Sequence, residues 1–336
     1  MERGVVVMKI GIPESLLYFS YSTLWNTFFE ELGADVILSG GTNKTILDAG
    51  TKYCVDEACL PVKIHHGHVM ALSNKADAIF IPRVMSISKN EYICPKFCGL
   101  PEMVKNSIDN LPHIIDTTIN MRKNEKSVYY SMINAGKIVT SRKSILNRAF
   151  YNAMNAQIEA DTKIKDNWKR ELEYSDVHCM KIGLIGHPYN IYDSFANMNI
   201  IEKLKQEGCS VVTIEMLDED RININAKTMG KRHFWTFGRK IVGAGLSFIS
   251  NKDVDGIISI TSFGCGIDSM MEDYIERHIK RDGCIPYMKL VLDEHSGEAG
   301  FDTRLEAFLD MVKWRRENES YISPYGGNIC SNKSIS

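Results

Sequence analysis

Cysteines are the residues of this chain best suited to chemistry, and there are nine of them. In a reducing compartment they should be free thiols or metal ligands rather than disulfides. Ligands of open parallel sheets bind outside the carboxyl ends of the strands, so the position of each cysteine relative to a predicted strand or helix separates the nine. Five are candidate ligands: Cys54, Cys59, Cys94, Cys98 and Cys265. We interpret four as structural or incidental, because they precede strands or lie in the tail: Cys179, Cys209, Cys284 and Cys330.

The predicted elements place the five candidates in three separate loops. Cys94 and Cys98 follow a strand predicted at residues 78–84, and Cys265 follows one at 256–260. Cys54 and Cys59 flank the start of a helix predicted at 57–72, whose amino end favours a thiolate. Dispersed thiolates suit zinc, copper(I) or an iron–sulfur cluster, but not a zinc ribbon with two close cysteine pairs. The alternative is a set of buried thiols that pack as small hydrophobic groups.

The chain is built of two similar halves, beginning Lys9-Ile-Gly-Ile-Pro and Lys181-Ile-Gly-Leu-Ile-Gly. Each half predicts a strand, then a helix (14–32 and 194–207) that ends at a glycine, then a second strand (35–38 and 211–215). Further strands are predicted at 113–116 and 286–292, and helices at 267–279 and 303–314. Alternating strands and helices indicate parallel sheets. We therefore predict an α/β fold with two Rossmann-like or flavodoxin-like domains.

The domain boundaries follow from composition. The amino-terminal α/β domain is predicted at 8–140 and the carboxyl-terminal one at 179–318. Between them, residues 141–178 are polar, nearly free of glycine and proline, and helical in pattern, which indicates a helical connector. The segment 319–336 is rich in Ser, Asn and Gly and is predicted to be a flexible tail.

The net charge and the first residues of the chain argue against nucleic acid and membranes as partners. With 40 basic and 42 acidic residues the formal net charge is −2, so the sequence carries no electrostatic footprint for nucleic acid or an anionic membrane. The first residues lack the apolar run of a signal peptide or membrane span. We expect a cytoplasmic protein, and a homodimer is one oligomeric state left open.

Several polar residues are predicted to accompany the cysteines. His187, Tyr189 and Asn190 follow the first strand of the second half and should line the same carboxyl edge as Cys265, with His187 a candidate for proton transfer. Glu298 follows the strand at 286–292 and is a candidate for acid–base work. The alternative to a proton-transfer role for His187 is that it fixes the turn before the next helix. The alternative to an acid–base role for Glu298 is that it caps the helix predicted at 303–314.

Other candidates lie beside the cysteines themselves. Gly264 and Gly266 would let the backbone approach a bulky cluster at Cys265, and Lys63 could stabilise its negative charge. On the helix at 57–72, the side chains of His65, His66 and His68 are expected to hydrogen-bond locally more than to bind metal. The glycine-containing turns lack the dinucleotide fingerprint, so we do not expect NAD or FAD.

Five motifs in order resemble one known family. They are Val55-Asp-Glu-Ala-Cys-Leu-Pro-Val-Lys63, Tyr92-Ile-Cys-Pro-Lys-Phe-Cys-Gly-Leu-Pro101, Gly186-His-Pro-Tyr-Asn-Ile-Tyr192, Phe263-Gly-Cys-Gly266 and Asp293-Glu-His-Ser-Gly-Glu-Ala-Gly300. The chain resembles the activase-related family of 2-hydroxyacyl-CoA dehydratase-like iron–sulfur proteins, once a domain of unknown function. The resemblance runs from about Lys9 to Trp314.

The resemblance implies a [4Fe-4S] cluster held by three cysteines, with one iron left open. Cys59, Cys94 and Cys265 match the family's motif positions, while Cys54 and Cys98 could serve a larger, double-cubane cluster. It also implies an acyl-CoA substrate and an ATP-dependent activase as electron donor. The chain has no G-x-x-x-x-G-K-[ST] loop, so such an activase would act in trans. An electron carrier or scaffold without substrate chemistry, and a zinc-stabilised or metal-free α/β binding protein, are the alternatives.

Overall fold

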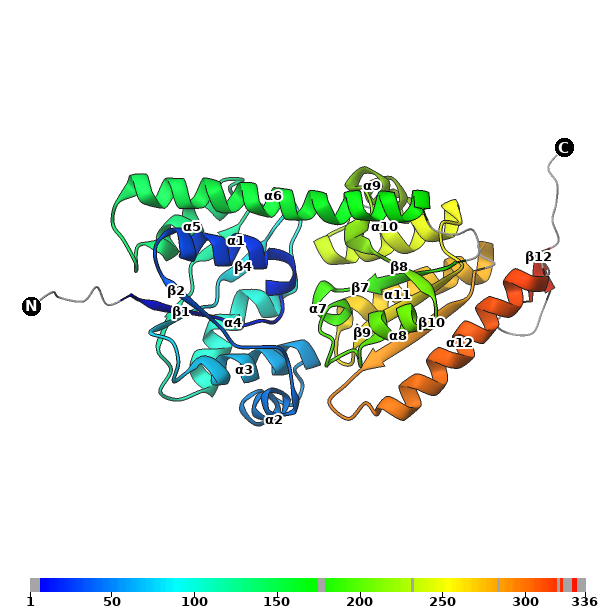
Figure 1. Cartoon of the computed structure of the whole chain (residues 1–336), viewed down its shortest axis with the longest axis horizontal. Helices are drawn as coiled ribbons and strands as arrows, with labels where there is room; N and C mark the ends of the chain where they lie inside the picture. The colour runs from blue at the N-terminus through cyan, green and yellow to red at the C-terminus, as the bar shows by residue number, and fades with distance from the viewer. Residues whose placement is uncertain are drawn as a thin grey trace, which may run out of the picture. The chain divides into compact units, whose positions relative to one another are not determined.

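The computed structural model describes residues 7–174, 179–230, 233–282 and 285–318, together with two short strands near the carboxyl end. The chain divides into two compact units. Unit 1 comprises Met1–Lys163 and the short segment Phe234–Thr236, and unit 2 comprises Ile164–His233 and Phe237–Ser336. Figure 1 shows the elements of both in chain order by colour.

Unit 1 is built on a parallel sheet with the order β2-β1-β3-β5. In this sheet Ile10 pairs with Val36 on one side and with Ala78 on the other. A second, two-stranded parallel pair is formed by β4 and β6. The strands are β1 (Lys9–Ile12), β2 (Asp35–Leu38), β3 (Ala78–Phe80), β4 (Arg83–Ser86), β5 (His113–Ile115) and β6 (Thr118–Asn120).

Five helices accompany the sheets of unit 1, and a sixth begins there. They are α1 (Tyr18–Glu31), α2 (Lys44–Tyr53), α3 (Leu60–Leu72), α4 (Pro95–Ser107), α5 (Ser127–Gly136) and α6 (Lys143–Tyr174). Helices α2 and α3 approach so closely that a β-carbon on Gly50 would lie 2.0 Å from the carbonyl oxygen of Lys63. Glycine is therefore required at the crossing of the two helices. Helix α6 is continuous over 32 residues in the region predicted as a connector (Figure 1).

Unit 2 repeats the same plan with the order β10-β9-β7-β8, again all parallel. The strands are β7 (Met180–Gly186), β8 (Cys209–Thr213), β9 (Gly256–Ser262) and β10 (Tyr287–Leu292). Strand β9 is buried along its whole length, as expected for a strand covered on both faces. The helices are α7 (Pro188–Ile191), α8 (Ile200–Gln206), α9 (Glu219–Ala226), α10 (Thr236–Asn251), α11 (Gly266–Asp282) and α12 (Glu298–Asn318), with 3₁₀ turns at Ile214–Met216 and Lys227–Met229.

The α/β class with parallel sheets is confirmed, but several predicted helix boundaries are wrong; for example, the helix predicted at 303–314 is α12, which begins at Glu298. The first helix starts at Tyr18 and not at residue 14, because Leu16 has a left-handed φ of 54° that no helix accommodates. The helix predicted at 194–207 begins only at Ile200, because Met198 and Asn199 have φ of 56° and 58°. The short helix α7 precedes it instead.

The remainder of the chain adds two observations. Strands β11 (Tyr321–Ile322) and β12 (Asn328–Cys330) pair antiparallel, and the rest of the predicted tail lies outside the described residues, as does Cys284. Among the helices that the structure describes, none combines the length and apolar character needed to cross a membrane.

Candidate functional site

The strand order of unit 2 has its topological switch point between β7 and β9, the position at which α/β sheets commonly form a binding crevice. The chain leaves β7 toward β8 on one side, and it leaves β9 toward β10 on the other. Loops that diverge in this way open a binding position at the carboxyl ends of the two central strands. His187 directly follows β7, and Cys265 lies three residues beyond the end of β9.

Three side chains of different chemistry meet in this crevice. Nε2 of His187 lies 3.9 Å from Sγ of Cys265 and 2.8 Å from Oδ1 of Asp268. One ligand atom from each residue lies within 4.8 Å of the other two. Asp268 comes from the first turn of α11, one helical turn after Cys265, so both face the same way.

The burial of these groups is unusual for their polarity. The side chains of His187 and Asp268 are 2% and 1% exposed. Oδ1 of Asp268 faces Nε2 of His187, but Oδ2 of Asp268 and Nδ1 of His187 have no hydrogen-bond partner among the described residues. Burying a carboxyl oxygen without a donor is costly unless a cation compensates it. The site is therefore suited to a metal ion or a metal cluster, with nitrogen, sulfur and oxygen donors that borderline-soft metals accept.

Packing fixes the imidazole of His187. Its ring stacks on Tyr189 with centroids 4.8 Å apart and meets the edge of Phe237 at 5.0 Å. Asn190, the next predicted site residue, uses both ends of its side chain in hydrogen bonds. Its Oδ1 accepts from Ser262 Oγ over 2.8 Å, and its Nδ2 donates to the carbonyl of Ile260. Tyr189 thus orients His187, and Asn190 ties α7 to the end of β9.

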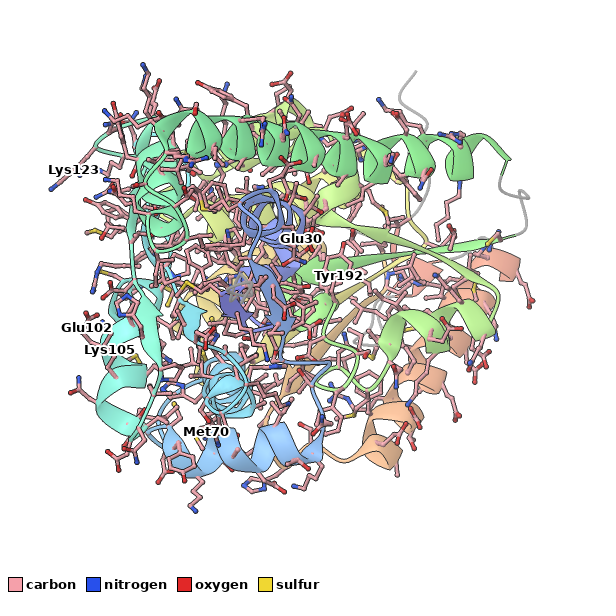
Figure 2. All side chains as sticks on the ribbon, turned by 60° about the vertical axis from the view of Figure 1, so that its left-hand side comes forward. Glu30, Met70, Glu102, Lys105, Lys123 and Tyr192 are labelled. Atoms are coloured by element: carbon pink, nitrogen blue, oxygen red, sulfur yellow. The ribbon has the colours of Figure 1, made fainter. Side chains whose placement is uncertain are left out.

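Glycines shape the backbone around the crevice. Gly264 has a left-handed φ of 78°, which a side chain would strain, and the position of a β-carbon on Gly266 is open space. A β-carbon on Gly186 would lie 2.4 Å from the carbonyl oxygen of Ile260, so glycine allows β7 and β9 to approach. Figure 2 labels Tyr192, whose hydroxyl donates to Glu215 Oε2 over 3.0 Å and so links the segment after α7 to that after β8.

The other two motif cysteines lie in unit 1, and each begins a helix. Cys59 is the N-cap of α3 and Cys94 the N-cap of α4, each with a proline in the first turn. Cys265 likewise immediately precedes α11, and its carbonyl accepts from the N–H of Ser269. All three thiols therefore stand at the positive end of a helix dipole, where negative charge is stabilised.

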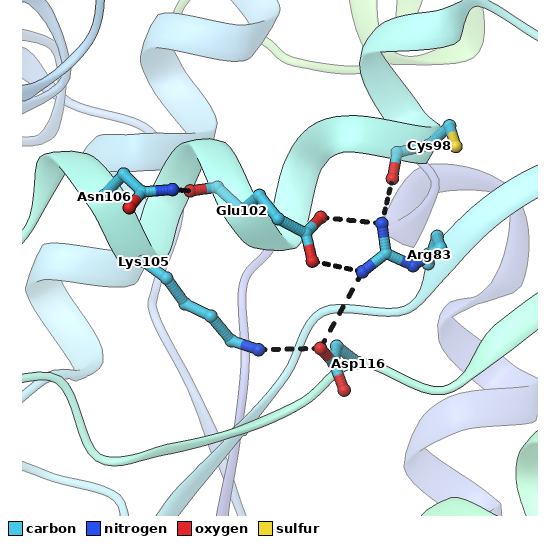
Figure 3. Close-up of polar contacts among 6 residues, drawn as sticks. All are labelled: Arg83, Cys98, Glu102, Lys105, Asn106 and Asp116. Atoms are coloured by element: carbon cyan, nitrogen blue, oxygen red, sulfur yellow. Dashed lines mark hydrogen bonds and ion pairs between the residues drawn. The ribbon is translucent and has the colours of Figure 1, made fainter.

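Two further cysteines and a lysine surround the unit 1 pair. Cys54 ends α2, and burial raises the pKa of its thiol, an effect that the charges of Lys63 and Lys96 oppose. Lys63 itself is buried on α3. Helix α3 contacts both α2 and α4. The three helices that carry Cys54, Cys59 and Cys94 at their ends are therefore neighbours in unit 1. The carbonyl of Cys98 accepts from Arg83, as Figure 3 shows.

The histidines of α3 are local hydrogen-bonding groups, as predicted. Nδ1 of His65 lies 2.8 Å from Ser15 Oγ, and His66 Nδ1 lies 2.8 Å from the carbonyl of Val62. His68 is held between two hydroxyls, of Ser39 and Thr42, at 2.8 and 2.9 Å. Burial lowers the pKa of His68 to about 4 and that of His65 well below its usual range.

Glu298 lies elsewhere. It opens α12, is 66% exposed and pairs with Lys203 at 2.8 Å, so its described partner is a surface lysine and not His187 or Cys265. Cys179 and Cys209 lie at the amino edge of the unit 2 sheet as predicted, and burial raises the pKa of Cys209 to about 11. Sequence reasoning missed Asp268 as a site residue, although its i+3 spacing from Cys265 on one helix was readable.

Solved structures offer only weak likenesses. The chain is similar to the SBP FpvC from Pseudomonas aeruginosa in complex with Mn²⁺, at 10% identity and a TM-score of 0.27 over 93% of this chain and 99% of that one. It is also similar to the Streptococcus pneumoniae AdcAII protein, at 8% identity and a TM-score of 0.24 over 91% and 98%. TM-scores this low carry no argument.

Sequence families are more informative. No curated protein matches the chain. The profile of the family described as "CoA enzyme activase uncharacterised domain" (DUF2229) matches residues 9–217, which covers unit 1 and the first two strands of unit 2, including His187. The chain therefore belongs to the CoA enzyme activase uncharacterised domain family.

Proposed function

We propose that this protein is the iron–sulfur redox component of a system related to 2-hydroxyacyl-CoA dehydratases, with Cys59, Cys94 and Cys265 as cluster ligands. The observation that carries the proposal is that each of these cysteines stands at the amino end of a helix. Family membership supports the relation to CoA enzymes. A [4Fe-4S] cluster bound there would supply one-electron transfer at low potential.

The donor set fits such a cluster. Thiolates are the usual ligands of iron–sulfur clusters, and helix amino ends stabilise the negative charge they bring. Lys63 adds a buried positive charge whose effect reaches Cys54. In unit 2 the open space at Gly266 leaves room beside Cys265. Cys54 and Cys98 are the additional thiols available if a double-cubane cluster is bound.

The residues around Cys265 have separate tasks in this proposal. Asp268 orients the imidazole of His187, and His187 holds a proton at Nε2 within reach of the sulfur of Cys265. Tyr189 keeps the ring in place by stacking. The partners we propose are an ATP-dependent activase acting in trans and an acyl-CoA substrate, in the cytoplasm.

Metal analysis tests the proposal directly. Protein purified and reconstituted without oxygen should contain about four iron and about four sulfide per chain, or about eight of each for a double cubane. The triple variant Cys59→Ala, Cys94→Ala, Cys265→Ala should lose them. The matched double variant Cys179→Ala, Cys209→Ala should retain them, because these thiols lie at the opposite edge of the sheet. Iron retained by the triple variant, or absent from the wild type, would refute the assignment.

Two outcomes separate catalysis from electron transfer alone. If a 2-hydroxyacyl-CoA thioester changes the electron paramagnetic resonance spectrum of the reduced protein, the cluster is where the substrate binds. An unchanged spectrum across a panel of thioesters favours the electron carrier or scaffold. The same sample with CoA alone controls for effects of the nucleotide portion.

A second candidate function is a mononuclear metal site formed by His187, Cys265 and Asp268, which the burial of the Asp268 carboxyl group beside a nitrogen and a sulfur donor favours. Such a site belongs to a zinc-stabilised α/β protein. It predicts about one zinc per chain that survives in Cys59→Ala and Cys94→Ala but is lost in Cys265→Ala. The cluster predicts loss of iron in all three single variants.

A further inference from the structure

Unit 1 contains a large pocket that the candidate metal ligands do not explain. It lies between α1, α5 and α6 and the strands β4 and β6. Its volume is about 680 Å³, within the range of roughly 300 to 1,000 Å³ typical of small-molecule sites. All of its lining residues belong to unit 1, and no cysteine or histidine is among them.

Aromatic and sulfur-containing side chains line the pocket. Trp25 of α1, Met132 of α5 and Phe150 of α6 are buried and line it together with the partly buried Tyr129. Tyr129 and Phe150 meet edge to face with centroids 5.2 Å apart, which fixes both rings. Flat rings and a flexible thioether present an apolar surface with little hydrogen-bonding capacity. The pocket is therefore suited to the apolar body of a ligand.

Helix α1, which forms one wall of the pocket, is interrupted where a side chain from α6 bonds to its backbone. Tyr21 has non-helical φ and ψ of −132° and 17°, which interrupts the helix. Gln157 of α6 fills the interruption: its Oε1 accepts from the N–H of Leu24 over 3.0 Å, and its Nε2 donates to the carbonyl of Ser20 over 3.2 Å. In a regular helix these two backbone groups would bond each other. The amide thus replaces one helical hydrogen bond, and this kind of insertion kinks a helix.

The inner end of the pocket adjoins a second, smaller cavity. Leu17 and Trp25 line both, and the smaller cavity has a volume of about 20 Å³. His65 lines it with a side chain 5% exposed, and its Nε2 has no hydrogen-bond partner among the described residues. The smaller cavity has room for about one water molecule, and Trp25 packs edge to face on the buried Phe80, so the wall shared by the two cavities is part of the core.

The rim exposes further apolar groups. Tyr130, Tyr151 and Ile158 line the pocket while being at least half exposed. Three charged residues also line the pocket, one basic and two acidic: Lys126, Glu125 and Asp161. Covering such apolar side chains is favourable, at about 25 cal/mol per Å² of apolar surface removed from water.

We propose that this pocket is a binding site for a hydrophobic small molecule that carries an aromatic ring or an acyl chain. The apolar body lies between Trp25, Tyr129 and Phe150, and the polar end stays at the rim. The proposal does not depend on a cluster or on the proposed redox function, because the pocket lies wholly in unit 1 and contains no candidate ligand.

Titration of the full chain with N-phenyl-1-naphthylamine tests the site. This neutral aromatic probe fluoresces in apolar surroundings, and we expect saturable uptake of about one probe per chain. Met154→Trp narrows the pocket from α6 at a partly buried position, and it should weaken binding about tenfold or more. Val128→Trp does the same from α5 and serves if the first variant does not fold. Met270→Trp, at a residue 69% exposed in unit 2, is the matched control and should bind like the wild type.

Competition identifies the ligand class. Displacement of the probe by decanoate indicates an acyl chain, and displacement by indole indicates a ring. Equal loss of binding in Met154→Trp and Met270→Trp, or uptake without saturation, would overturn the proposal. Dimerisation in sedimentation experiments that Met154→Trp abolishes, without probe uptake by the wild type, would overturn it too and assign this surface to a second copy of the chain.

Discussion

The two units treat their buried histidines differently. In unit 1, His65 and His68 receive hydroxyl partners from Ser15, Ser39 and Thr42. In unit 2, Nε2 of His187 faces a thiol and one carboxyl oxygen of Asp268, while Nδ1 of His187 and Oδ2 of Asp268 have no hydrogen-bond partner among the described residues. A buried polar network whose members are nearly all paired stabilises a fold, whereas one left short of partners is ready for a ligand.

The contrast extends to the cysteines. Unit 1 carries Cys59 and Cys94 at helix amino ends, with buried Lys63 nearby, so positive charge surrounds them. In unit 2, Cys265 lies beside one nitrogen donor and one oxygen donor, from His187 and Asp268. The same fold therefore provides sulfur ligands with compensating charge in one unit and a mixed donor set in the other.

The largest expected effect is acid destabilisation of unit 1. The pKa of His68 falls from 6.5 to about 4 on burial, so the unfolded chain binds a proton at a higher pH than the folded one. The resulting stability is complete above pH 6.5 and is lost as the pH falls toward 4, by about 3 kcal/mol in total. Urea unfolding between pH 7.5 and 4.5 measures it.

The controls for this effect are histidine variants. His68→Gln should reduce the pH dependence by the share that His68 contributes, because glutamine does not titrate and the buried His65 and His66 remain. His113→Gln at an exposed position should leave it unchanged. A wild-type free energy of unfolding that stays constant from pH 6.5 to 4.5 would show that burial does not keep His68 neutral.

The next effect concerns unit 2. Asp268→Asn should weaken binding of Zn²⁺ by about 10- to 100-fold, because the neutral amide is a poorer ligand. The metal-free protein should lose little stability, because the amide oxygen of asparagine can still accept from Nε2 of His187, and Oδ2 of the carboxyl group has no partner to lose. Asp273→Asn, at an exposed position of the same helix, is the control. Calorimetric titration measures the affinity for Zn²⁺, and thermal unfolding measures the stability of the metal-free protein. A large fall in both the affinity and the stability would mean that Asp268 has a structural role only.

Sequence reasoning located the strands better than the helices. The predicted strand at 35–38 coincides with β2, and that at 256–260 lies within β9, because β-branched runs bounded by turns are local signals. The predicted helix starts are wrong where Leu16, Met198 and Asn199 adopt left-handed backbone conformations. None of these residue types reliably predicts such a conformation. Helix α10 was not predicted at all.

The candidate site was only partly readable. His187 and Cys265 were both placed at the carboxyl edge from their positions after strands, and their approach to 3.9 Å depends on β7 and β9 being neighbours. Strand order is a long-range property that residue patterns do not encode. The sequence did not single out Asp268 as a site residue, because its burial is invisible in a single sequence. That Cys59 and Cys94 share one cluster with Cys265 stays a prediction.

A smaller effect is expected from Ser39→Ala in unit 1. Ser39 Oγ accepts from the N–H of Glu14 over 2.8 Å and lies 2.8 Å from His68 Nδ1. Removing the hydroxyl leaves both groups short of a partner, so the free energy of unfolding should fall by about 1.5 kcal/mol. Ser73→Ala, which removes a hydroxyl at the end of α3, should change it little. Equal effects of the two variants in urea unfolding would contradict the view that the unit 1 histidines depend on their hydroxyl partners.

The smallest expected effect is at the contact that holds the Cys94 helix. Arg83 forms a bidentate pair with Glu102 and donates to the carbonyl of Cys98, and Lys105 pairs with Asp116 beside it (Figure 3). Arg83→Lys cannot keep both contacts, and because the pair is partly exposed the loss should be about 1 kcal/mol. Hydrogen exchange in α4 should quicken by about fivefold, the same free energy expressed as a rate.

Exchange in α11 is the internal control for Arg83→Lys, since that helix belongs to unit 2. Lys44→Met, which removes an exposed ion pair on α2, is the matched variant and should leave exchange in α4 unchanged. If Arg83→Lys leaves α4 unaffected, the amino end that carries Cys94 is held by the packing of α4 against β4 and α3. Unit 1 would then share with unit 2 a cysteine positioned by backbone and core, and only the charges around it would distinguish the two.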